Sequence, residues 1–454
     1  MSMQNGETAP LLGGVPNLAR NGHVDQAANR TRRVATVRAV TYSVLTLVFV
    51  LALVGVFLFW DKLTGVVGRL PKDPHEAALL IMERAPVING VSYVKTCVKD
   101  GHIDLPILAR FAYKNNASAI DLTKPFEGHV DIPRLREGKV GGFFWSVYVD
   151  CPTKEEQSDD FLKPTNRVRD TLEQIDIAKL LINKYPETFA WTLSSQEIKV
   201  AISRGKISSL LGVEGAHQLG NSIPTLRQYY DLGVRYITLT HACHNAFADS
   251  CGMFPALEPL HGGLSPLGFS LIEEMNRLGM LIDLSHTSDD TAKQALKHSK
   301  APVIWSHSSA REVNNVPRNV PDDVLALIGT GPNQTDAVVM VNFAPIFVAP
   351  PGQADVKRVA DHVEHIANVA GKKHVGLGSD FDGIGETPVG LEDVSKYPAL
   401  VAELYERGWN TFELAGLTGG NLLRVMEVAE RVASELQRSG MEPVMARYEK
   451  RSDL

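Results

Sequence analysis

The sequence has little of what several classes of protein require. Its 454 residues carry a formal net charge of -6, so the basic excess of a nucleic-acid-binding protein is missing and we predict no nucleic-acid partner. Only 4 Cys are present, too few for a disulfide-dense scaffold, although one or two bridges fit. The Gly pairs at 141–142, 262–263 and 419–420 lack the spacing of phosphate-binding loops and are interpreted as turns.

Long apolar runs are also scarce, with one exception. Residues 39–60 contain no charged side chain and match the ~20 residues that a helix needs to cross a bilayer. We predict a disordered cytoplasmic tail over 1–38, a single transmembrane helix over 39–60 that contacts membrane lipid, and a linker over 61–73. The arginines between residues 30 and 38 place the N-terminus in the cytoplasm, so the remaining chain is expected to be lumenal or extracellular.

Two sequence triplets agree with this orientation. Asn116 and Asn333 each begin an N-x-S/T triplet, which is an acceptor for N-glycosylation on the lumenal side. The composition leaves a homodimer open. Residues 441–454 are predicted to form a charged C-terminal tail.

Between residues 74 and 440, short apolar runs alternate with amphipathic stretches. The expected strands are 142–149, 207–213, 236–240, 281–285, 303–306, 337–342 and 375–378, with one more near His102. The expected helices include 167–184, 225–232, 267–278, 289–298, 355–370 and 411–436. Such alternation predicts parallel strands. The fold class is therefore α/β, and about eight units favour a (β/α)₈ TIM-type barrel over the alternative, a doubly wound sheet.

The ends of the expected strands carry polar side chains that can do chemistry. The residues at these positions are Glu214, His241, His286, His307 and Asp380. In a (β/α)₈ barrel the carboxyl ends of the strands form the active-site face, so we expect these side chains to meet. Imidazole and carboxylate are ligands suited to Zn²⁺. The pattern therefore predicts a zinc-dependent hydrolase.

An Asp-Gly-His-Ile-Asp stretch precedes all of these. His102 and Asp104 point to the same side of an extended segment and can bind one metal together. We expect two zinc ions, one held by His102 and Asp104 and one by His286 and His307, with Glu214 bridging both. A hydroxide bridging the metals is the expected nucleophile, and Asp380 is the expected proton acceptor.

The remaining histidines fit other roles. His362 and His365 have helical spacing and are interpreted as structural, because their stretch is charged. His129 lies in a loop or helix context without an evident partner. Asp283 lies inside its strand and is expected to make a structural hydrogen bond.

At this point the motifs resemble the membrane (renal-type) dipeptidase family, metallopeptidases of the amidohydrolase superfamily. The matching stretches are 100–106, 144–148, 212–215, 233–241, 283–286, 306–309, 318–323, 378–383 and 390–397. The resemblance implies two Zn²⁺ ions, with ligands His102, Asp104, Glu214, His286 and His307. It also implies hydrolysis of an L-aminoacyl dipeptide to two amino acids.

The resemblance further implies substrate contacts and a disulfide. His241, Arg318 and Asp380 take the positions that contact substrate in the family. Arg318 offers a planar fork for the dipeptide carboxylate, and His241 offers a donor for the oxyanion. Cys151 and Cys243 occupy positions that pair in relatives.

Two departures from the family leave alternatives open. Relatives in animals use a C-terminal lipid anchor, whereas this chain is expected to use residues 39–60. Relatives also lack the segment 89–99, which here interrupts the expected first strand before His102. A one-residue slip would turn His102 and Asp104 away from the site. The alternatives are a related amidohydrolase acting on another amide or a β-lactam, and a non-catalytic surface protein with a degenerate site.

Overall fold

The computed structural model describes residues 33, 36–38, 40–50, 70–89, 105–126, 128–153, 156, 161–163 and 166–451. It divides the chain into two units, Met1–Leu70 and Pro71–Leu454. In the first unit, residues 40–50 are helical and their side chains are exposed. Of the helices in the described parts of the chain, none combines the length and the apolarity that crossing a membrane requires. The predicted span 39–60 lies partly outside these parts, which omit residue 39 and residues 51–60.

The second unit is an α/β fold with a near-closed barrel of parallel strands. The strands are β1 Val87–Asn89, β2 Val140–Tyr148, β3 Phe189–Trp191, β4 Ile207–Glu214, β5 Val234–Thr238, β6 Leu281–Asp283, β7 Val303–Trp305, β8 Ala337–Val341 and β9 Val375–Leu377. Eight of them follow one another in the order β1-β2-β4-β5-β6-β7-β8-β9, and β3 pairs with β4 outside this path. β1 and β9 contact each other at the seam, so the TIM-type architecture predicted from the alternation is confirmed.

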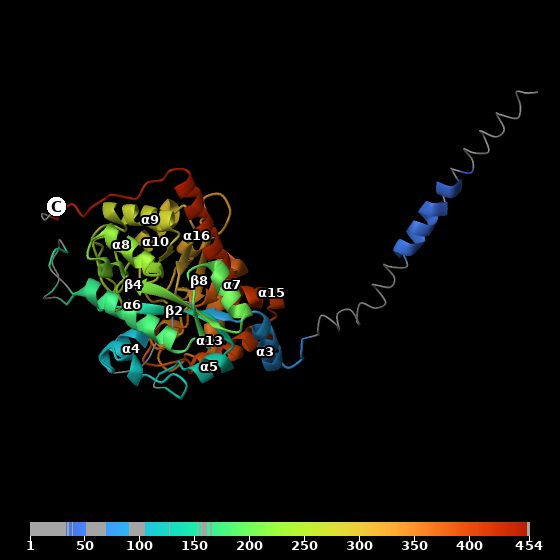
Figure 1. The fold of residues 1–454 in the computed structure, drawn as a ribbon, viewed down its shortest axis with the longest axis horizontal. Coiled ribbons are helices and arrows are strands. Elements are labelled where there is room, and N and C mark those ends of the chain that lie inside the picture. The colour runs from blue at the N-terminus through green and yellow to red at the C-terminus, as the bar shows by residue number, and fades with distance from the viewer. Residues whose placement is uncertain are drawn as a thin grey trace, which may run out of the picture. The chain divides into compact units, whose positions relative to one another are not determined.

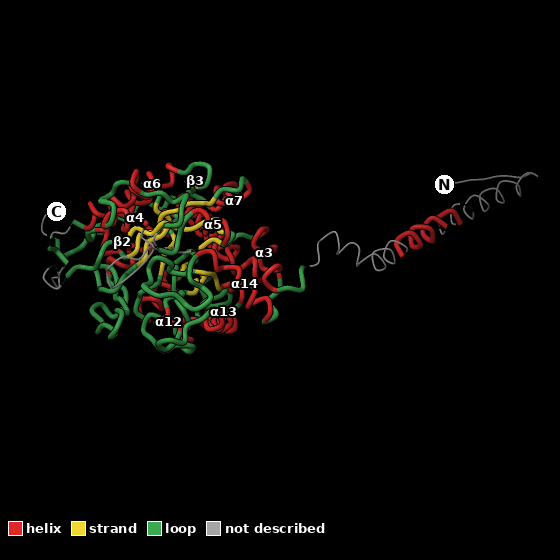
Figure 2. Tube along the Cα trace, turned by 90° about the horizontal axis from the view of Figure 1, so that it is seen from below, coloured by secondary structure: helices red, strands yellow, loops and turns green. Residues whose placement is uncertain are grey.

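Helices surround this ring of strands (Figures 1 and 2). The longer ones are α3 Pro74–Arg84, α6 Arg167–Lys184, α7 Ser195–Ser203, α8 Ile223–Asp231, α9 Pro266–Leu278, α10 Asp289–His298, α13 Val356–Ala370, α14 Tyr397–Glu406 and α16 Asn421–Arg438. The shorter ones are α4 Leu105–Phe111, α5 Ile132–Glu137, α11 Asp322–Leu325, α12 Pro345–Val348 and α15 Thr411–Ala415. Single turns are η1 Ala117–Ala119, η2 Ala216–Leu219, η3 Lys372–His374 and η4 Val394–Lys396.

Side-chain caps set the beginnings of several helices. The Ser288 hydroxyl accepts from the Thr291 amide at the start of α10, and Asp355 accepts from the Arg358 amide at the start of α13. Each cap satisfies an amide that has no partner within the helix, which is worth about 1 kcal/mol. The observed beginnings of both helices lie within one residue of the predicted ones.

One buried cluster of apolar side chains joins the strands of the barrel to α16. Phe144 of β2, Tyr236 of β5 and Met340 of β8 belong to one buried cluster with Leu422 and Val425 of α16. Burial of this apolar area supplies the main driving force for closing the ring.

The stretch predicted as one helix over 411–436 is broken, so that prediction is wrong. A π-helical turn, η5 Gly416–Gly420, separates α15 from α16, and Gly419 has non-helical angles. A Cβ on Gly419 would lie 2.8 Å from the Ile88 side chain, so a glycine is required where this turn approaches β1. The Thr418 hydroxyl donates to the Ala85 carbonyl, and the turn thereby closes the seam between the first and last strands.

The C-terminal segment after α16 packs back onto the barrel. It runs past α9 and α8 in Figure 1, and the Val444 amide donates to Glu274 of α9 at 3.0 Å. Arg227 of α8 donates to the Val444 carbonyl at 3.1 Å. Residues 441–451, predicted as a charged tail, therefore make defined contacts.

Candidate metal centre and active site

Three predicted metal ligands lie at the carboxyl ends of neighbouring strands. Glu214 is the last residue of β4, His286 follows β6 and His307 follows β7. All three side chains are buried. His286 has a φ of 63°, in the left-handed region that a side chain with a Cβ rarely adopts. The backbone is therefore held in an unfavourable conformation at a position where it aims an imidazole into the site.

The ligand atoms of these residues converge on one point. Glu214 Oε1 lies 3.0 Å from His286 Nε2 and 3.2 Å from His307 Nε2, and the two Nε2 atoms are 3.1 Å apart. Four ligands around a tetrahedral zinc ion at about 2.0–2.1 Å are separated by about 3.3 Å. The three atoms therefore have the chemistry and the spacing of a shared metal site.

The electrostatics of the site agree with a bound cation. Burial raises the pKa of Glu214 well above its ordinary value, with a smaller opposing effect from Arg318 and a further rise from Asp283. A carboxylate removed from water is costly unless a positive charge is close to it. A metal ion at this point would restore the ionised form of Glu214, so the residues present fit zinc.

His241 also belongs to this buried group. Its Nε2 lies 3.9 Å from Glu214 Oε1, and the ligand atoms of Glu214, His241 and His286 are all within 4.8 Å of one another. The His241 ring packs against His286 at 4.2 Å and against Tyr148 at 4.8 Å between centroids. Predicted to bind substrate, His241 is thus also near enough to serve as a metal ligand.

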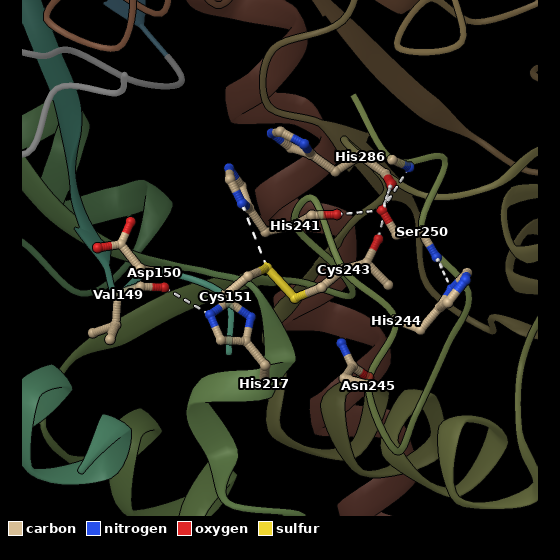
Figure 3. Close-up of a disulfide and its surroundings, with 12 residues drawn as sticks. Val149, Asp150, Cys151, His217, His241, Cys243, His244, Asn245, Ser250 and His286 are labelled. Atoms are coloured by element: carbon tan, nitrogen blue, oxygen red, sulfur yellow. Dashed lines mark hydrogen bonds between the residues drawn. A yellow bond between two sulfur atoms is a disulfide. The ribbon is translucent and has the colours of Figure 1, made fainter. Parts of the chain in front are cut away.

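A disulfide lies next to His241. Cys151, after β2, and Cys243, after β5, are bonded and have Cα atoms 6.1 Å apart. In Figure 3 a dashed line joins His241 Nδ1 to the Cys151 sulfur, which are 3.9 Å apart. His217 lies on the other side and donates from Nε2 to the Val149 carbonyl at 2.7 Å. The bridge thus joins the loops after β2 and β5 where they hold His241.

The two remaining predicted contacts with substrate are at the same end of the barrel. Arg318 is buried and donates to the Ser308 hydroxyl and the His307 carbonyl, both at 3.2 Å. Its Nε has no hydrogen-bond acceptor within the described residues. Asp380 follows β9 and accepts from the Asn342 side chain at 2.8 Å. A buried guanidinium and a buried carboxyl thus lie at this end of the barrel together with the metal centre.

The other predicted metal pair, His102 and Asp104, lies outside the described residues. The strand predicted near His102 falls there too, and the first strand that the structure describes is β1, Val87–Asn89, which pairs in parallel with β2. Helix α4 begins at Leu105, immediately after Asp104. Asn116 and Asn333, the predicted glycosylation sites, are both exposed.

Sequence reasoning missed some residues of the site and its surroundings. Asn342, at the end of β8, orients Asp380, and its place at a strand end was the one available signal. His129, expected to have no partner, lies with Nδ1 3.0 Å from Asp382 Oδ1, which corrects that interpretation. The two residues are far apart in the sequence, so no local pattern could indicate their pairing. His362, by contrast, has the structural role expected of it, because it bonds to the Ala310 amide and the Val348 carbonyl.

Comparison with known proteins adds a family to this geometry. The family model described as membrane dipeptidase (peptidase family M19) matches residues 92–440. A protein of Schizosaccharomyces pombe named as an uncharacterized dipeptidase is 45% identical over 380 residues, which are 83% of this chain and 88% of that relative.

Solved structures agree with this result. A dipeptidase described as a metallo peptidase of family M19 is 28% identical with a TM-score of 0.65, covering 76% of this chain and 98% of that one. A metallo peptidase from Rhodobacter sphaeroides, liganded with a phosphinate mimic of the dipeptide L-Ala-D-Ala, is 26% identical with a TM-score of 0.65, covering 76% and 99%. The resemblance drawn from the motifs is thus confirmed, and the chain belongs to the membrane dipeptidase family, peptidase family M19, as a hydrolase of the metallo-dipeptidase type.

Proposed function

We propose that this protein hydrolyses dipeptides to free amino acids with two zinc ions bridged by Glu214. The observation that carries the proposal is the convergence of His286 and His307 on the buried Glu214 carboxyl, at 3.0 and 3.2 Å. In this proposal His286 and His307 hold one ion, and His102 and Asp104 hold the other. Zinc, when bound, would lower the pKa of water to about 7 and polarise a carbonyl group.

The residues around the metal centre define the substrate. Arg318 binds the C-terminal carboxylate of the dipeptide through its planar fork, and its buried position makes that ion pair strong. Asp380 meets the free α-amino group, which limits the substrate to two residues. The metallo peptidase from Rhodobacter sphaeroides, which carries a dipeptide mimic, supports this substrate class.

Two side chains serve the reaction itself. Asp380, oriented by Asn342, accepts the proton of the attacking water and returns it to the leaving amine. His241, fixed between Tyr148 and His286, donates a hydrogen bond to the oxygen that becomes negative in the transition state. Both side chains are buried, so the contacts form in a site with little competing water.

The proposal is tested by assaying the full chain on a panel of dipeptides, the matching tripeptides and a β-lactam, with zinc and with a chelator. We expect dipeptides to be cleaved only with zinc and tripeptides to be cleaved much more slowly. Equal cleavage of tripeptides would refute the dipeptidase specificity, and activity in the chelator would refute the metal mechanism. Opening of the β-lactam alone would favour the alternative amidohydrolase, and a single bound ion without activity would favour a degenerate site.

We further propose that residues 39–60 anchor the protein in a membrane with the catalytic unit outside the cytosol. Support comes from the uncharged run and from the arginines that precede it. Acquisition of glycans at Asn116 and Asn333, measured as a mobility shift removed by an endoglycosidase, is the expected result in membrane-bearing extracts. A protein that is released by carbonate washing and never glycosylated would contradict this orientation.

A further inference from the structure

We propose that Asp283, acting through the Ser306 hydroxyl, fixes the tautomer of His307 so that Nε2 presents its lone pair to the metal. Asp283 is the last residue of β6, and Ser306 follows β7 directly before His307. All three side chains are fully buried. The inference rests on the proposed metal site, and it gives Asp283 a positioning role in place of the purely structural one expected from sequence.

Asp283 is surrounded by hydrogen-bond donors. Its Oδ1 accepts from the backbone amides of Ser285 and Ser306 at 3.0 and 2.8 Å. Its Oδ2 accepts from the hydroxyls of Thr238 and Ser306 at 2.6 and 2.5 Å. Four donors match the acceptor capacity of an ionised carboxylate, whereas a protonated one would have to donate a hydrogen to a neighbour.

The direction of the single Ser306 hydroxyl proton follows from this. It points to Asp283 Oδ2, so the Ser306 oxygen can only accept from its other neighbours. One of these is His307 Nδ1, at 2.7 Å, and the other is the Ser285 hydroxyl, at 3.3 Å. Ser285 can donate to Ser306 because its oxygen already accepts the His307 amide at 3.0 Å. Every group in this network then has a partner of the right kind.

The consequence falls on the other nitrogen of His307. With the hydrogen on Nδ1, the neutral ring carries its lone pair on Nε2, the atom that faces Glu214 and His286. Histidines that bind metals usually donate their second nitrogen directly to a carboxylate, a carbonyl or a water. Here a serine hydroxyl stands between the imidazole and the carboxylate and transmits the same constraint.

The test is Asp283→Asn in the full chain. The two backbone amides on the Oδ1 side hold the amide oxygen there, so the new NH₂ group takes the place of Oδ2. It donates to Ser306, whose hydroxyl proton then turns toward His307 Nδ1 and moves the ring hydrogen to Nε2. We expect the affinity for the zinc ion held by His307, measured by competition with a chromophoric chelator, to fall about 10–100-fold.

A matched control is Thr238→Val. It removes the other hydroxyl bonded to the same Asp283 oxygen but leaves the path through Ser306 intact. We expect its zinc affinity to stay within about 2-fold of the wild type. If Asp283 were merely structural, Thr238→Val and Asp283→Asn would have similar zinc affinities. Ser306→Ala deletes the hydroxyl between Asp283 and His307, and its zinc affinity is expected to fall as in Asp283→Asn. It replaces Asp283→Asn in the test if that variant fails to fold.

Nitrogen-15 NMR of the metal-free protein gives a second readout. The His307 signals, assigned by their absence in His307→Ala, are expected to show hydrogen on Nδ1 in the wild type and on Nε2 in Asp283→Asn. Wild-type affinity in both Asp283→Asn and Ser306→Ala, or hydrogen on Nε2 in the wild type, would overturn the proposal. Both readouts are independent of turnover, so they remain decisive even if no dipeptide is cleaved.

Discussion

Two groups of acidic and imidazole side chains in this protein have similar composition and different surroundings. Glu214, His241 and His286 form one, and Glu312, Asp322 and His365 form the other. In each, the ligand atoms lie within 4.8 Å of one another. The first group is buried at strand ends, whereas the second lies at the surface, with the Asp322 and His365 side chains 41% and 26% exposed.

The comparison teaches that proximity of such side chains does not by itself make a metal centre. His365 Nε2 already pairs with Asp322 Oδ1 at 2.7 Å, and water screens the remaining charge. Glu214 is deprived of water, and burial raises its pKa. The buried group is the one for which a metal ion would relieve an unfavourable state.

The largest expected effect separates the two carboxylates. Glu214→Gln keeps the shape of the side chain but removes the charge that the proposed metal site would require, so we expect kcat/KM on a dipeptide to fall about 10³-fold or more. Glu312→Gln is the matched control and is expected to leave kcat/KM unchanged. Comparable losses in both variants, measured at saturating zinc, would contradict the assignment of the buried group.

The imidazoles are expected to differ in the same direction. His307→Ala removes an atom 3.2 Å from Glu214 Oε1, and we expect the zinc content, measured by atomic emission, to fall by about one ion per chain. His365→Ala is expected to keep the wild-type content because its ring pairs with Asp322 at the surface. Loss of zinc from the His365 variant would contradict this assignment, because it would show that the surface group binds a metal.

A third comparison concerns cations. Arg318 is buried, whereas Arg407, at the end of α14, makes ion pairs with Asp361 and Glu364 at the protein surface. Replacing Arg318 by Lys loses the two-point contact with a carboxylate, which costs about 1.5–3 kcal/mol, so KM is expected to rise about 10–100-fold. Arg407→Lys should not change KM. A dipeptide amide, which lacks the carboxylate, is expected to be insensitive to Arg318→Lys.

The smallest expected effect concerns two Asp–His pairs and pH. Burial raises the pKa of Asp382, the partner of His129, to about 7. Since an unfolded Asp titrates near ~3.9, the folded protein holds a proton between about pH 4 and 7 that the unfolded chain has lost. The free energy of unfolding therefore falls as pH rises through this window.

Asp382→Asn removes this contribution, so its Tm relative to the wild type should rise by roughly 2–5 °C between pH 5 and pH 8. Asp322→Asn, at the exposed pair, is expected to keep the wild-type pH dependence. Thermal unfolding followed by circular dichroism measures both. Parallel pH profiles for all three proteins would show that Asp382 does not titrate in this window.

The sequence allowed most of the barrel to be predicted because its signals are local. Strands β4 and β7 read as short apolar runs that end in polar residues, and the predicted bounds of α6 and α10 match those observed. Strand β3, Phe189–Trp191, was missed, and it lies outside the strand order of the barrel, where it pairs only with β4 among the described strands. The Gly pair at 419–420 was interpreted as a turn, and η5 confirms it, but the helix 411–436 was still predicted as unbroken. The position of the break depends on the approach of Gly419 to Ile88 of β1, a contact between residues far apart in the sequence.

The candidate site divides in the same way. Glu214, His286 and His307 could be found because each ends an apolar run. The roles of Ser306 and Asp283 depend on hydrogen bonds between β5, β6 and β7, and which hydroxyl faces which oxygen is decided by strand register. Register is a property of the assembled sheet, so it is difficult to predict from a single sequence.

The placement of the proposed metal ligands at the carboxyl ends of β4, β6 and β7 has a consequence for folding. These strands are separated in the chain by whole helices, so the three ligand atoms come together only when this side of the ring has been assembled in register. A metal that binds only the assembled state stabilises it by RT ln(1 + [L]/Kd), about 2.7 kcal/mol at one hundred times Kd. Zinc supply would then govern how long each molecule persists as well as how fast it turns over substrate, because molecules that lose the metal would unfold and be degraded more readily.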